Sequence, residues 1–242
     1  MNNGAIAFLD ILGFKGIWQK EKPEKVLSIM QGVLQRVEKT YKQPPPEKGW
    51  PESKGPDITI LSDTIVVGFR SEHPACLALI ATVIYDLIHY FLEFNMFFRG
   101  AVGYGQYVQD GNIFLGPVID DVASWYQAAN WIGVVSTPRT NYFIDCLSIN
   151  PLVINSISVP FYAKYDVPDK KGSTYRLNCL NWPAYLQACY KTIPQQNTKI
   201  EVHQLIEKAF TEQYPFSANE LEKYENTLKF IDFCVSKMEK DN

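Results

Sequence analysis

The order of short apolar runs and helical repeats is the feature that most constrains the fold. An apolar run closed by Gly13 has the length of a buried strand, and the segments after it alternate between helical and strand spacing. The predicted elements are a strand at 4–12, a helix at 20–41, a hairpin over 58–69, a helix at 73–94 and a strand at 97–108. This β-α-β-β-α-β order predicts an α+β fold of the ferredoxin-like type.

The second half of the chain predicts a smaller hairpin and then mostly helices. A turn at Asp110-Gly111 leads into a strand at 113–115. The further predicted elements are a helix at 116–130, strands at 131–135, 159–166 and 173–179, and helices near 183–191, 202–214 and 217–238. We expect a domain over 1–180 and a C-terminal helical extension over 181–242 that packs on it.

Composition narrows the class of protein. With 242 residues, 46% of them hydrophobic, the chain can bury one sizeable core. A net charge of −3 argues against nucleic-acid binding, which usually requires a basic surplus. The five cysteines are widely spaced and odd in number, which is typical of reduced thiols. With no apolar stretch of membrane-spanning length, we expect a soluble, cytoplasmic protein without a membrane contact.

Two carboxylates stand in apolar surroundings. Asp10 lies at the end of an otherwise apolar strand, and Asp63 lies at the turn of the hairpin over 58–69. A carboxylate in either place is costly unless it is solvated, paired or bound to a cation. The first strand and this hairpin are neighbours in a βαββαβ sheet, so the two side chains are expected to converge. Hard oxygen ligands of this kind suit Mg²⁺ or Mn²⁺.

Four motifs along the chain resemble, in kind and in order, those of class III adenylate and guanylate cyclases. The catalytic domain of that family has the element order βααββαβ. They are Phe8-Leu9-Asp10-Ile11-Leu12-Gly13-Phe14, Leu61-Ser62-Asp63-Thr64-Ile65-Val66-Val67, Arg99-Gly100-Ala101-Val102-Gly103-Tyr104-Gly105 and Gly116-Pro117-Val118-Ile119. Together they span roughly residues 5–136. The resemblance implies a nucleotidyl cyclase that forms a 3′,5′-cyclic nucleotide and pyrophosphate from a nucleoside triphosphate.

The resemblance also implies residue roles. Two divalent metal ions, Mn²⁺ or Mg²⁺, would be held by Asp10, Asp63 and the backbone carbonyl of Ile11. The substrate-binding residues would be Ile11, Leu12, Gly13, Phe14, Lys15, Thr59 and Arg99, the first four through backbone facing the phosphates. The family places its sites at a subunit interface, so a head-to-tail homodimer is implied.

The chain departs from the family at four positions. The family's transition-state Asn and Arg fall on Asp120 and Ser124, so Asp120 becomes the candidate catalytic residue on that helix. Its purine-reading residues fall on Thr59 and Ile113. A chain that keeps both metal-site Asp residues and lacks the purine readers resembles bacterial uridylate and cytidylate cyclases of antiphage signalling. The aromatic segment 125–138 is typical of the same group.

Simpler interpretations stand beside each role. Asp10 and Asp63 could be a solvated strand end and a turn residue, Asp120 an acid favoured in a first helical turn, and Arg99 a structural ion-pair residue. As a whole, the chain could instead be a catalytically degenerate cyclase fold that binds a nucleotide or a partner without turnover. A palm-type polymerase is a third alternative, although the hairpin lacks the doubled acidic turn common in such palms.

Overall fold

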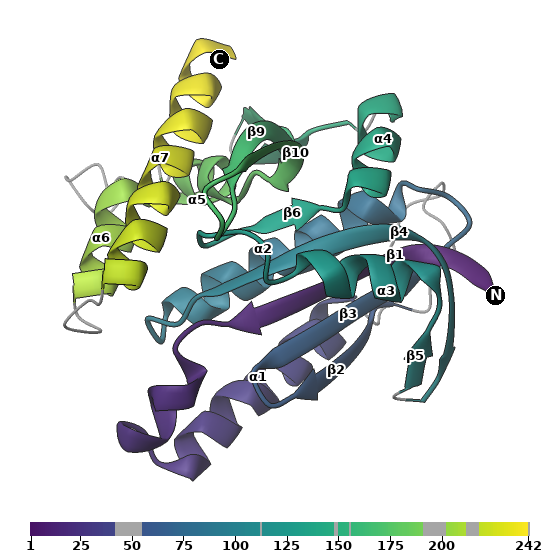
Figure 1. Cartoon of the computed structure of the whole chain (residues 1–242), viewed down its shortest axis with the longest axis horizontal. Coiled ribbons are helices and arrows are strands. Elements are labelled where there is room, and N and C mark those ends of the chain that lie inside the picture. Colours follow the sequence, from purple (N-terminus) through teal and green to yellow (C-terminus); the bar gives the residue numbers. More distant parts are fainter. Residues whose placement is uncertain are drawn as a thin grey trace.

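A mixed sheet forms the centre of the structure, a computed structural model that describes residues 1–41, 55–111, 113–147, 150–154, 156–190, 202–211 and 218–241 (Figure 1). Its strand order is β2-β3-β1-β4-β6-β10-β9, and neighbours are antiparallel except β4 and β6. The strands are β1 (Asn2–Ile11), β2 (Asp57–Leu61), β3 (Thr64–Arg70), β4 (Phe98–Asp110), β6 (Val134–Ser136), β9 (Tyr162–Pro168) and β10 (Thr174–Leu180).

Three short strands lie outside that path. β5 (Ile113–Leu115) pairs with the far end of β4, while β7 (Leu152–Ile154) and β8 (Ile157–Val159) form a separate hairpin. The predicted hairpins over 58–69 and around Asp110-Gly111 are therefore both present, and the pair β7–β8 is additional.

Different helices cover the two faces of the sheet. α2 (Cys76–Leu92) lies behind the central strands and α3 (Pro117–Trp125) in front of them (Figure 1). Alternate residues of β4 show the same division. The Tyr104 hydroxyl donates to the carbonyl of Glu72 beside α2, whereas a Cβ on Gly103 would meet Val122 and Val118 of α3. The front face, under α3, is also the face of Phe8 and Asp10.

The first predicted helix is shorter than expected, and the third ends early. α1 begins at Pro23 and runs to Tyr41, after a short 3₁₀ helix, η1 (Phe14–Gln19). The predicted helix at 116–130 stops at Trp125, and the strand expected at 131–135 runs over Val134–Ser136. Residues 126–133 instead form turns and bends, with an isolated bridge between Ala129 and Asp169. Most of the predicted loop 43–56 lies outside the described residues.

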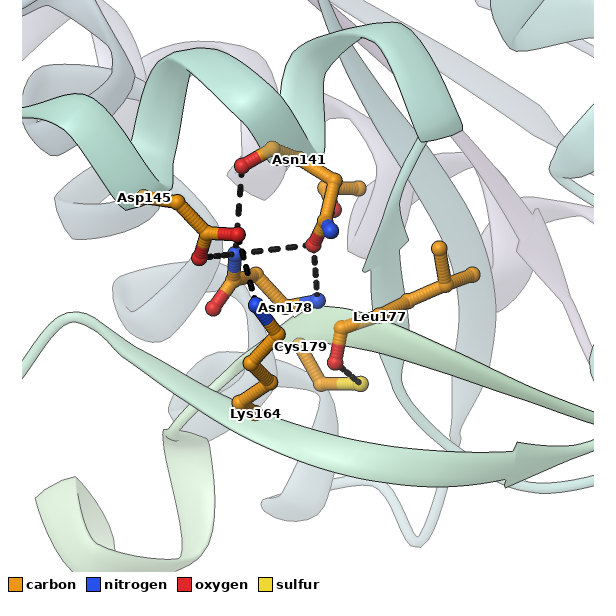
Figure 2. A network of polar contacts seen from close by, with 7 residues as sticks. Asn141, Asp145, Lys164, Leu177, Asn178 and Cys179 are labelled. Atoms are coloured by element: carbon orange, nitrogen blue, oxygen red, sulfur yellow. Dashed lines mark hydrogen bonds and ion pairs between the residues drawn. The ribbon is translucent and has the colours of Figure 1, made fainter.

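α4 (Pro138–Cys146) was not predicted, and a polar network joins it to β9 and β10 (Figure 2). β6 is short, and its pairing with β10 is confined to Val135 and Cys179. The Asn141 Oδ1 atom accepts the Asn178 backbone N–H at 2.6 Å and its side-chain amide at 2.8 Å. Asn178 also donates to Asp145, which pairs with Lys164 at 2.6 Å. A side chain of α4 thus takes the place of a strand partner for β10.

The C-terminal helices pack on the same core as the sheet. They are α5 (Trp182–Tyr190), α6 (Val202–Thr211) and α7 (Ala218–Asp241). Phe210 stacks on Phe97 at 5.0 Å between ring centres, and the buried Thr227 hydroxyl accepts the Ile132 backbone N–H at 2.9 Å. The domain boundary at residue 180 stays a prediction. In the described segments no helix is long and apolar enough to span a membrane.

Candidate functional site

Asp10 and Asp63 are brought together by strand register. Asp10 pairs with Thr64 across β1 and β3, and the Ile11 N–H donates to the carbonyl of Asp63 at 2.8 Å. Asp63 itself is half-buried in the tight turn between β2 and β3, where Ser62 has a positive φ of 57°. The predicted convergence of strand end and hairpin turn follows directly from this pairing.

Arg99 is the immediate partner of Asp10. The two residues are paired across β1 and β4, and the Arg99 Nε and Nη2 atoms donate to Asp10 Oδ2 at 3.0 and 2.9 Å. Asp10 is 6% exposed and Arg99 7%, so both charges are buried. The remaining nitrogen, Arg99 Nη1, is buried without a hydrogen-bond partner among the described residues. Asp10 therefore has a counter-ion, and that counter-ion has an unused donor.

Tyr126 lies beside both carboxylates, in the segment that follows α3. Its ring meets Phe8 edge-on at 5.9 Å, and its hydroxyl accepts a hydrogen bond from the Gln127 amide at 3.0 Å. Burial raises the pKa of Tyr126, and the charges of Asp10 and Asp63 raise it further, while Arg99 opposes them. Both acids thus act on the pKa of the same side chain, in agreement with the backbone pairing that places Asp63 beside Ile11.

Lys170 is an exposed residue of the turn between β9 and β10, and its backbone is attached to the segment that follows α3. Asp169 Oδ1 accepts the backbone N–H groups of Lys171 and Ser173, and the Lys170 N–H donates to the carbonyl of Ala128 at 3.4 Å. Burial lowers the pKa of Lys170, as do the Arg99 and Lys223 charges, whereas Asp10 raises it. Sequence reasoning missed Lys170; its only signal was the Asp-Lys-Lys-Gly turn between two predicted strands.

Some of the backbone N–H groups of residues 11–14, which were expected to face the phosphates, already donate hydrogen bonds within the protein. The N–H of Ile11 donates to Asp63, and that of Leu12 donates to the carbonyl of Phe97 at 2.8 Å. Gly13 adopts a left-handed conformation with φ 73° and begins η1. Within the described part of the chain, the Gly13 and Phe14 N–H groups have no acceptor. An anion can therefore be met by two of the four predicted backbone groups, and the Lys15 side chain lies outside the described residues.

The remaining predicted site residues have contacts of their own elsewhere on the sheet and on α3. Asp120 is exposed in the first turn of α3, where its carbonyl accepts the Ser124 hydroxyl at 2.8 Å. Thr59 is half-buried on β2 opposite Val66, and Ile113 is 60% exposed on β5. No described contact joins any of them to Asp10, so the roles of Asp120 and Thr59 stay predictions.

The carboxylates fit a metal ion held mainly by substrate phosphates. No cluster of three or more His, Cys, Asp or Glu side chains occurs in the ranges that the structure describes. Mg²⁺ is commonly bound by one or two carboxylates together with phosphate oxygens, and it does not require an all-protein cage. Asp63 is accessible in its turn, and Asp10 Oδ1 accepts no hydrogen bond among the described residues. Asp10, Asp63 and the Ile11 carbonyl are the groups that would hold such an ion.

Comparison with known proteins bears on the fold. No protein-family model matches the sequence, and no curated protein matches it either. Among solved structures, the catalytic core of a rhodopsin-guanylyl cyclase with converted specificity, in complex with ATPαS, superposes with a TM-score of 0.51. The match covers 74% of this chain and 94% of that one at 10% sequence identity. The chain shares the fold of a nucleotidyl cyclase catalytic core. The cyclase fold leaves the predicted choice of nucleotide open.

Proposed function

We propose that the protein is a metal-dependent nucleotidyl cyclase that converts a nucleoside triphosphate to its 3′,5′-cyclic monophosphate and pyrophosphate. The observation that carries the proposal is the pairing that brings Asp10, at the end of β1, close to Asp63 in the turn between β2 and β3, with Arg99 bonded to Asp10. The cyclase fold and the four sequence motifs support the same activity.

The residues divide the chemistry between them. Two divalent ions, when bound, would polarise the ribose 3′-hydroxyl and neutralise the triphosphate. Asp10 and Asp63 would hold these ions, and Arg99 would donate N–H groups to phosphate oxygens. The buried setting of Asp10 and Arg99 excludes water, which strengthens their interactions with a charged substrate. The 3′-oxygen attacks the α-phosphorus, and pyrophosphate leaves.

The base and the biological role rest on the resemblance and on two residues. Thr59 and Ile113 stand where purine cyclases carry their base readers, so UTP or CTP is the proposed substrate. The proposed product is a second messenger of antiphage defence. A homodimer is part of the proposal, and the exposed Leu61, Ile113 and Leu115 supply apolar surface for it, being 75%, 60% and 65% exposed.

Two observations favour a second candidate function. α3 carries Asp120 and Ser124 where the family has its transition-state Asn and Arg, and Arg99 already neutralises Asp10. A cyclase fold that binds a nucleotide without turnover agrees with both features. The two candidates differ in one measurable quantity, the formation of product.

The test is a turnover assay with each of ATP, GTP, CTP and UTP in Mn²⁺ and then Mg²⁺, with products resolved by mass spectrometry. We expect a cyclic pyrimidine monophosphate, reduced at least about 100-fold in Asp10→Asn and Asp63→Asn, because the bound ions would supply several kcal/mol. Asp57→Asn is the matched control, because Asp57 is a half-buried acid at the opposite end of the same hairpin. A cyclic purine would refute the base assignment, and nucleotide binding without any product would favour the second candidate.

A further inference from the structure

We propose that Arg99 is a latch that keeps Asp10 from binding a divalent metal ion until a triphosphate arrives. The proposal rests on the proposed metal and triphosphate site, and it concerns the order in which that site is filled. Its basis is the buried pair in which two Arg99 nitrogens donate to one oxygen of Asp10 at 2.9 and 3.0 Å.

The first step concerns charge. Asp10 and Arg99 are paired and at least nine-tenths buried, so together they present little net charge to an approaching cation. In the absence of a nucleotide, Asp63 therefore supplies most of the negative charge that attracts a free divalent ion to the site. To coordinate Asp10 it must also compete with two charge-assisted hydrogen bonds, which are the stronger kind.

The second step concerns the unused donor. Arg99 Nη1 is buried and has no partner in the described part of the structure. A buried N–H that is left unpaired is unfavourable, because it has lost its hydrogen bonds to water without gaining a protein acceptor. Asp10 Oδ2 takes only Nε and Nη2, so the latched state leaves this cost in place. A triphosphate offers several acceptor oxygens and so can satisfy a guanidinium more completely than one carboxylate oxygen does.

The two steps couple nucleotide and metal. When Arg99 turns its N–H groups to a phosphate, Asp10 loses its counter-ion inside a buried site and becomes a much stronger cation ligand. Asp10 would then be able to hold a divalent ion that arrives with the triphosphate. Binding of either species alone leaves one charge uncompensated, so metal and triphosphate are expected to bind cooperatively.

The first experiment measures Mn²⁺ binding to the full chain without nucleotide, by the electron paramagnetic resonance signal of free Mn²⁺. We expect Arg99→Gln to bind Mn²⁺ at least about tenfold more tightly than the unaltered protein, because a nearby positive charge is removed. Arg70→Gln is the matched control, since Arg70 ends a strand of the same sheet and pairs with Asp57 at 3.3 Å. Asp10→Asn/Arg99→Gln should lose the gain. Equal Mn²⁺ affinity in the Arg99→Gln variant and the unaltered protein would overturn the latch.

The second experiment takes its result from the unaltered protein and uses a variant only to assign one resonance. The Arg99 Nε–H resonance is followed by nuclear magnetic resonance in the unaltered protein, with Arg99→Lys used to assign it. Mg²⁺ alone should leave the resonance in place, and Mg²⁺ with inorganic tripolyphosphate should move it. A shift with Mg²⁺ alone would contradict the proposal. Tripolyphosphate carries no base and no ribose, so the result does not depend on the choice of nucleotide or on turnover. If the turnover assay yields a cyclic nucleotide but the Arg99 resonance does not respond as expected, only this inference is overturned and the proposed function stands.

Discussion

Stability and proposed chemistry make opposite demands on Asp10. The folded chain needs Asp10 as the partner of a buried arginine, whereas the proposed reaction needs it as a metal ligand. Removing one member of a buried ion pair leaves the other charge uncompensated, which is costlier than removing both. The pair therefore has a measurable signature that is independent of any substrate.

Asp10→Ala should lower the free energy of unfolding by roughly 3–5 kcal/mol, because Arg99 is then buried and unpaired. Asp10→Ala/Arg99→Met should recover most of that loss. The control is Asp57→Ala, which breaks the exposed pair with Arg70 and should cost less than about 1 kcal/mol. Urea unfolding monitored by fluorescence gives all three values. Equal losses in Asp10→Ala and Asp57→Ala would contradict the importance of the buried pair.

The site residues that the sequence indicated and those that it missed are positioned by different kinds of contact. Asp10 and Asp63 could be picked out because one ends an apolar strand and the other lies in the turn of an apolar hairpin, and backbone pairing brings them near each other. Tyr126 and Lys170 could not, because they lie on turns held by tertiary hydrogen bonds such as Lys170 to Ala128. Local patterns carry no information about such contacts.

At the scale of elements, α4 shows how a polar side chain can extend a sheet. The helix buries only Thr140 among its nine residues, so it has no apolar stripe, and periodicity did not reveal it. Its start has ordinary signals, a Thr137 cap and Pro138 in the first turn. Its attachment to β10 depends on the network of Asn141, Asn178, Asp145 and Lys164 (Figure 2).

This network makes part of the stability depend on pH. Hydrogen bonds from Lys164 and Asn178 hold the pKa of Asp145 below its ordinary value. A carboxyl with a lowered pKa stabilises the fold above its unfolded pKa of about 3.9, and this contribution is lost as the pH falls through the folded value. Thermal melts should therefore separate Asp145→Asn from the unaltered protein at pH 6–7 and bring them together near pH 3. A difference that persists at pH 3 would assign the effect to packing.

At the scale of the whole molecule, the C-terminal helices support the segment that carries Tyr126. Thr227 of α7 receives the Ile132 N–H, and Asn226 donates to the carbonyl of Asn130 at 3.1 Å. Asn130 in turn donates to Pro168, at the start of the turn that holds Lys170. The C-terminal helices, which their apolar spacing predicted, thus also hold the segment that carries Tyr126 by hydrogen bonds. The apolar spacing could not predict these hydrogen bonds.

Thr227→Val should lower the free energy of unfolding by about 1–3 kcal/mol, because the shape is kept and the buried Ile132 N–H loses its acceptor. Thr211→Val is the control: Thr211 is also on a C-terminal helix and donates to a carbonyl of its own turn, but it is exposed. Its change should stay within about 0.5 kcal/mol. Chemical denaturation measures both free energies of unfolding. Equal losses in the two variants would contradict a stabilising role for the hydrogen bond between Thr227 of α7 and Ile132.

The central position of β1 has a consequence for synthesis on the ribosome. β1 pairs with β3 at residues 64–70 and with β4 at residues 98–107, so both of its neighbours are made long after it. At about 5–20 residues per second, an apolar strand waits for several seconds or more before either neighbour exists. During that interval its backbone groups are open to pairing with another nascent chain. The strand that bears Asp10 is thus made early and enclosed late, and the Asp10–Arg99 pair cannot form before β4 has left the ribosome.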